Sequence, residues 1–121
     1  MKLLILGHMI PEPTTTAAGS RMLQLIALFQ EEGYIIHFAT SALQNPRSVD
    51  LNSIDVTLDI IQLNHSSFDS YIIDLGPDVV LYDRFVIEEH YGWRVAQCCP
   101  SALRILDTED LVPESLMIMG D

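Results

Sequence analysis

Apolar runs alternate along the chain with segments whose apolar residues recur at helical spacing. The apolar runs predict strands at residues 2–6, 34–39, 56–61, 78–82 and 103–106. A continuous run such as KLLIL at the start is typical of a strand covered on both faces. Apolar residues that recur three, four and seven positions apart predict helices at residues 20–32, from 66 or 67 to 75, and at 87–98.

Strict alternation of strand and helix predicts an α/β fold with one parallel sheet, because the connections suit crossovers better than hairpins. We expect a single Rossmann-like domain with about five strands in the order 3-2-1-4-5 and helices on both faces. Ligands of such sheets bind beyond the carboxyl ends of the strands, where the strand order reverses. A site is therefore expected between the first and fourth strands.

The connection after the first strand is unusually long for a strand-to-helix loop. It runs from Gly7 through IPEPTTTAA to Gly19, and loops of this length more often bind a ligand than merely join two elements. Gly19 and Ser20 open the predicted helix, whose N-terminus favours an anion. Arg21 is either a solvated side chain or the partner of an anion or a carboxylate. Neither the dinucleotide fingerprint nor the triphosphate loop is present in the sequence.

Further polar residues follow the predicted strand ends. His8 is a candidate general base or hydrogen-bond donor, or a structural histidine. Asp83 and Arg84 form either an ion pair in a turn or part of a site. The carboxylates Asp107, Glu109 and Asp110 could hold magnesium, but no lysine lies near the fifth strand as in phosphotransfer receivers, so the pattern favours acids at a helix N-terminus.

Composition narrows the classes of partner. The 121 residues are 49% apolar and 19% charged, which fits one folded domain. A net charge of −11 repels phosphate backbones and anionic lipid, which excludes nucleic acid as an expected partner. No apolar run is long enough for a membrane span. Cys98 and Cys99 are adjacent, so they are expected to be buried thiols of a cytoplasmic protein rather than a disulfide.

Three stretches carry a resemblance to a known family: LILGHMIPEPTTTAAGSRMLQLIALFQEEGY, DVVLYDRFVIEEHYGWRV and LRILDTEDL. Together they resemble the amino-terminal, acceptor-side domain of GT-B-fold bacterial glycosyltransferases of the group-one-like family, over residues 1–111. The resemblance implies a nucleotide-sugar substrate and no other cofactor or metal. It places Gly19, Ser20 and Arg21 toward the donor phosphate. On the cleft or acceptor side it places His8, Asp83, Arg84, Asp107, Glu109 and Asp110, and it assigns no catalytic residue in this half.

Family members are much longer, and their carboxyl-terminal domain supplies most of the donor pocket. Residues 112–121 are therefore expected to be a tail, the truncated start of a helical region, and the 121 residues to be inactive alone. The expected partners are that second domain or a second copy of the chain, besides a small-molecule or sugar acceptor. Self-association would use the apolar residues Leu111, Leu116, Met117, Ile118 and Met119.

Two other functions fit the residues. One is a small binding or interaction module that uses the fold without chemistry, since a fold does not determine a function. The other is a receiver-like metal-binding domain built on the acidic residues after the fifth strand.

Overall fold

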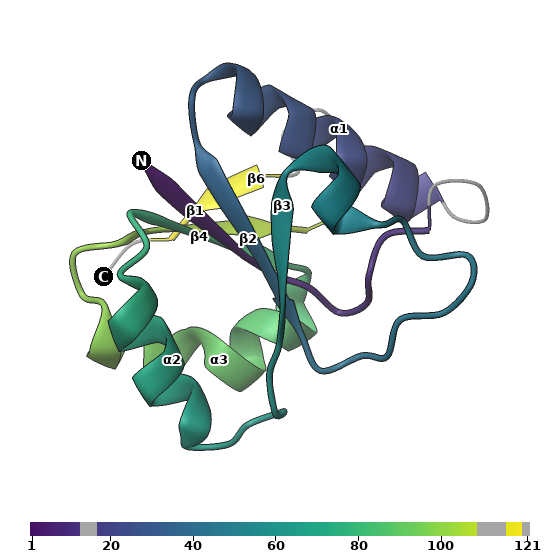
Figure 1. Cartoon of the computed structure of the whole chain (residues 1–121). Helices are drawn as coiled ribbons and strands as arrows, with labels where there is room; N and C mark the ends of the chain where they lie inside the picture. The colour runs from purple at the N-terminus through teal and green to yellow at the C-terminus, as the bar shows by residue number, and fades with distance from the viewer. Residues whose placement is uncertain (13–16, 109–115, 120–121) are drawn as a thin grey trace.

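The computed structural model describes residues 1–12, 17–108 and 116–119. Its strands form one sheet in the order β3-β2-β1-β4-β5-β6 (Figure 1). The strands are β1 (Lys2–Leu6), β2 (Ile35–Thr40), β3 (Val56–Ile60), β4 (Val79–Asp83), β5 (Leu103–Asp107) and β6 (Leu116–Ile118). The helices are α1 (Ala17–Glu31), α2 (Ser67–Leu75) and α3 (Phe85–Cys98), with a 3-10 turn, η1 (Leu51–Ile54), before β3. The predicted Rossmann-like α/β class and its 3-2-1-4-5 order are confirmed.

The first five strands are parallel, and β6 adds to the sheet in the opposite direction. It pairs with β5 through Ile105 and Ile118, Leu106 and Met117, and Asp107 and Leu116. This strand was not predicted from the sequence, because three residues are too few to show an alternating pattern. Part of the tail expected as the start of a helical region is thus a strand.

The sheet separates two layers of helix, with α1 on one face and α2 and α3 on the other (Figure 1). Side chains of a strand alternate between the two faces. Leu4 and Leu6 therefore pack into the core under α2 and α3, whereas Leu3 and Ile5 pack into the core under α1. All four are fully buried, which explains why β1 is apolar without interruption.

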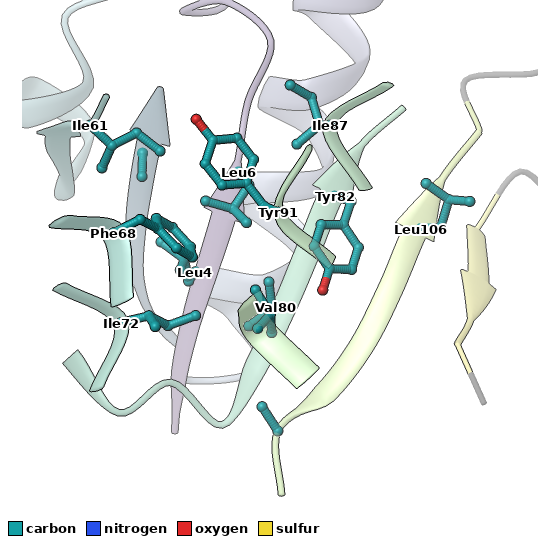
Figure 2. Packing of buried hydrophobic residues seen from close by; sticks show 13 residues of the cluster. Leu4, Leu6, Ile61, Phe68, Ile72, Val80, Tyr82, Ile87, Tyr91 and Leu106 are labelled. Atoms are coloured by element: carbon teal, nitrogen blue, oxygen red, sulfur yellow. The ribbon is translucent and has the colours of Figure 1, made fainter. Parts of the chain in front are cut away.

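The core under α2 and α3 contains aromatic residues from both helices and from the sheet (Figure 2). The rings of Phe68 in α2 and Tyr91 in α3 lie 4.8 Å apart between their centroids. They cover Leu4 and Val80 of the central strands. Burying one large apolar side chain contributes about 1.5–3 kcal/mol to stability, so this layer fixes both helices on the sheet.

The other core contains the buried face predicted for the first helix. Met22, Leu25 and Ile26 are buried as expected, whereas Phe29 is half-buried. The helix begins at Ala17 rather than at residue 20, because the two alanines before Gly19 favour helix as strongly as any residue. Within the described ranges, no helix combines the length and apolar character that a bilayer crossing requires.

Gly7 sets the direction in which the chain leaves β1. Its N–H donates a hydrogen bond to the carbonyl of Ala39, 2.9 Å away. A Cβ at this position would overlap the ring of Phe38. Glycine is therefore required for the backbone to pass over this ring into the long loop.

Candidate functional site

The carboxyl ends of β1, β4 and β5 lie together at one edge of the sheet, on either side of the point where the strand order reverses. His8 follows β1, Asp83 ends β4 and Asp107 ends β5. The parallel register places Asp83 directly beside Asp107. Because α1 starts at the same edge, residues predicted from distant parts of the sequence are neighbours here.

Arg21 connects the first turns of α1 to β5. Its Nη1 donates hydrogen bonds to both carboxylate oxygens of Asp107, at 2.6 Å from Oδ1 and 2.5 Å from Oδ2. The Asp107 side chain is only 1% exposed and that of Arg21 is 30% exposed. Of the alternatives left open for Arg21, the structure selects a carboxylate partner. A buried carboxylate requires such a cation, since its desolvation is otherwise costly.

Asp83 is a second buried carboxylate at this edge, with 5% of its surface exposed. Its Oδ2 accepts a long hydrogen bond, 3.4 Å, from the backbone N–H of His8. Its Oδ1 is buried and has no hydrogen-bond partner among the residues that the structure describes. The His8 side chain itself is exposed. Asp83 therefore retains an acceptor atom that the described protein does not use.

Arg84 has a backbone conformation that is rare outside glycine. Its φ is 81° and its ψ is 163°, in a region that costs about 1–3 kcal/mol for a residue with a side chain. Its N–H donates to the carbonyl of Asp107 at 2.8 Å. This bond holds the sharp turn from β4 into α3 against the end of β5.

The loop after β1 folds over the start of α1. A Cβ at Gly19 would lie 2.5–2.8 Å from backbone atoms of Glu12, so only glycine lets the loop lie this close to the helix. Glu12 is 8% exposed, and its Oε2 accepts a hydrogen bond of 2.9 Å from the Asn45 side chain. Gly19 is consequently buried, whereas Ser20 next to it is exposed.

A cavity of about 90 Å³ lies between this loop, α1 and the end of β4. It is lined by Met9, Pro11, Glu12, Ala18, Gly19, Met22, Asp83 and Arg84. Most of this lining is apolar, with two carboxylates and one guanidinium as its charged groups. An apolar wall with a few polar groups is the composition of ligand sites, but the volume is below the roughly 300–1,000 Å³ of pockets that enclose a whole small molecule.

The structure brings together most of the residues predicted from the sequence. His8, Gly19, Asp83 and Arg84 meet at or beside the cavity, and Arg21 and Asp107 pair next to it. Glu109 and Asp110 lie outside the described residues. Their predicted roles, and those of the other seven, including Ser20, remain predictions.

Glu12 lines the cavity and was not predicted as a site residue. The available signal was an acidic residue enclosed by two prolines, Pro11 and Pro13, in a loop that is otherwise uncharged. Charge in such a rigid segment indicates a defined position rather than a solvated one.

The adjacent cysteines are free thiols and are half-buried rather than fully buried. Both pack against the core under α2 and α3, and burial raises the pKa of each thiol. A thiol with a raised pKa is a weak nucleophile at neutral pH. Across residues 1–12, 17–108 and 116–119, no three histidine, cysteine or acidic side chains gather in a way that could hold a metal ion.

Neither a family model nor a curated protein matches this chain.

Proposed function

We propose that this domain is the acceptor-side half of a glycosyltransferase, which moves a sugar from a nucleotide-sugar donor to a small-molecule or sugar acceptor. The proposal is supported above all by the position of the cavity at the switch point between β1 and β4. It is supported further by the three stretches of sequence that resemble this class of enzyme.

The first turns of α1 would face the donor phosphates. Ser20 is exposed there, at a helix end whose dipole favours an anion. Arg21 is adjacent, but its Nη1 is already bound to Asp107. Arg21 would thus hold the helix start in place, and its positive charge near the surface would still attract a diphosphate.

Sugar transfer would require a second domain over this edge. A closed cleft excludes water, which would otherwise compete with the acceptor for the activated sugar. The described residues form one α/β sheet with its helices, and the cavity lies where β1 and β4 end. We therefore expect them to bind parts of the substrates without transferring sugar.

The test is a titration of the ¹⁵N-labelled chain with UDP and UDP-glucose, with uridine as the control that lacks phosphate. We expect saturable amide shifts at Gly19, Ser20 and Arg21 with the two phosphate compounds only. Ser20→Asp should abolish these shifts, because it adds negative charge where the phosphates would lie while favouring the helix. Ser70→Asp is the matched control, since Ser70 is exposed on α2.

Two outcomes would count against the proposal. Equal shifts with uridine would show that the first turn does not recognise phosphate. No shifts at millimolar UDP would contradict a donor-facing α1 and would favour a binding or interaction module without chemistry.

A further inference from the structure

A groove of about 510 Å³ lies at the edge of the sheet opposite to the candidate site, where β2 and β3 begin. It is formed by the end of α1, the start of β2 and the end of η1. Its lining residues are Gln30, Tyr34, Ile35, Ile54 and Asp55. The volume falls within the roughly 300–1,000 Å³ of pockets that enclose a whole small molecule.

The walls of this groove are held in place without a ligand. Nε2 of Gln30, near the end of α1, donates a hydrogen bond of 2.7 Å to the carbonyl of Ile54 in η1. Tyr34 and Ile54 both pack against the core under α1, and the Tyr34 ring meets the ring of Phe29 at 5.2 Å between centroids. The groove is therefore preformed, and its aromatic and aliphatic parts are fixed on the domain.

The charge around the groove is negative. Asp55 is the one charged residue of the lining and is exposed, and its carboxylate takes part in no hydrogen bond or ion pair within the described residues. The last turn of α1 contains no basic residue, and the exposed Glu31 and Glu32 stand at its end. A helix C-terminus carries partial negative charge and favours a cation, so these acids increase a negative potential that the fold does not neutralise.

We propose that this groove binds a small organic cation, in which an ammonium group is attached to an apolar or aromatic body. The ammonium group would pair with Asp55, and the body would lie against Tyr34 and Ile54. An aromatic ring also attracts a cation that lies over its face. The Gln30 amide donates to Ile54 and retains its carbonyl oxygen as an acceptor for an ammonium N–H.

Other classes of ligand fit the groove less well. Calcium requires six to eight oxygen ligands, whereas the lining supplies one carboxylate. An anion would be repelled by Asp55 and by the acidic end of α1. A neutral apolar molecule would leave both without a counter-ion. Because the groove and the candidate site lie at opposite edges of the sheet, this proposal goes beyond the proposed function and does not depend on it.

The experiment measures amide shifts of the ¹⁵N-labelled chain at Gln30, Tyr34, Ile54 and Asp55. Four compounds separate charge from apolar body: 2-phenylethylammonium, its neutral analogue 2-phenylethanol, ethylammonium, and the anion 3-phenylpropionate. We expect saturable shifts with 2-phenylethylammonium. The neutral analogue and ethylammonium should each bind about fivefold more weakly, because one lacks the charge and the other lacks the ring. The anion should not bind.

A matched pair of variants tests the role of the carboxylate. Asp55→Asn should weaken the binding of 2-phenylethylammonium about fivefold, the effect of losing a partly solvated ion pair. Asp55 has a φ of 63°, which asparagine adopts as readily as aspartate, so the variant should keep its turn. Asp50→Asn removes the same charge at the other end of η1, where the side chain makes no capping hydrogen bond, and should leave the affinity unchanged.

A second pair tests the aromatic wall. Tyr34→Ser should reduce the affinity for 2-phenylethylammonium to that for ethylammonium, whereas Tyr34→Phe retains the ring and should bind normally. Melting temperatures show whether each variant is folded. Undiminished binding to folded Asp55→Asn, equal binding of 2-phenylethanol, or no shifts with any of the four compounds would overturn the proposal.

Discussion

Arg21 and Asp107 are 86 positions apart in the chain, yet one guanidinium nitrogen of Arg21 binds both carboxylate oxygens of Asp107. The pair joins the start of α1 to the end of β5. The cavity lies between α1, the loop after β1 and the end of β4, which is the strand beside β5. The ion pair therefore contributes both to the stability of the domain and to the shape of the candidate site.

Arg21→Ala should destabilise the protein, because it removes a cation from a carboxylate that is 1% exposed. Loss of one partner of a fully buried pair costs about 3–5 kcal/mol, and we expect about 2 kcal/mol here since Arg21 is itself partly exposed. Urea unfolding measures the difference. Arg47→Ala, in an exposed loop, should change the free energy of unfolding by less than about 0.5 kcal/mol. Equal effects of the two variants would contradict the importance of the pair.

Two helical glycines should respond in opposite ways to replacement by alanine. At Gly19 the new Cβ would lie within 2.8 Å of the Glu12 backbone, and the resulting overpacking should cost about 1–3 kcal/mol. At Gly92 in α3 the three atoms nearest to the new Cβ all belong to the flexible side chain of Glu88, which can move aside. Gly92→Ala should then be neutral or stabilise by up to about 1 kcal/mol, because alanine favours helix.

Thermal unfolding of both variants gives this comparison directly. If Gly19→Ala were as stable as the unchanged chain, the loop would not lie on the helix as the structure has it. A loss of stability in Gly92→Ala of the same size as in Gly19→Ala would show that Glu88 cannot move.

Much of the fold follows from the order of apolar segments. The central strands β1 and β4 are predictable because both of their faces are covered, so no polar residue interrupts the apolar run of either strand. The predicted start of α1 was three residues too late, because the prediction followed the spacing of the apolar residues and left out the two alanines, whose helix propensity is high. β6 was missed because its three residues are exposed at an edge, where neither burial nor length imposes a pattern.

The candidate site was predictable in position and only partly in its contacts. The topology places His8, Asp83 and Asp107 at one edge of the sheet, independently of their side-chain conformations. Which carboxylate binds Arg21 depends on distances between helix and sheet that no local pattern contains. The burial of Glu12 likewise depends on its close approach to Gly19 across the loop and on Asn45, which is 33 positions away in the sequence.

Three tyrosines should remain protonated in alkaline solution while the protein is folded. Burial raises the pKa of Tyr71, Tyr82 and Tyr91 above the ordinary value of 10.0, and at Tyr71 the 2.6 Å hydrogen bond to Asp59 adds to this effect. Above pH 10 the unfolded chain then loses protons that the folded chain retains. Stability is therefore fully present below pH 10 and decreases as the pH rises beyond it.

Phenolate absorbance in a pH titration checks this. The three tyrosines with a raised pKa should ionise only when the protein unfolds, so their phenolate absorbance should appear together with unfolding. Tyr71→Phe should remove about one third of this absorbance, because Tyr71 is one of the three. Ionisation of every tyrosine in a single step near pH 10, with the fold intact, would refute the prediction.

The edge strand β6 should cause the chain to self-associate. Leu116, Met117 and Ile118 are 39%, 50% and 71% exposed, and β6 is the last strand at its side of the described sheet. An apolar strand at a sheet edge offers backbone hydrogen bonds and apolar surface to a second copy.

Sedimentation velocity should therefore show an average mass that increases with concentration. Ile118→Lys should abolish the increase by placing charge on the edge, whereas Ile73→Lys, at an exposed position of α2, should not. A chain that stays monomeric at high concentration would mean that this edge is already protected.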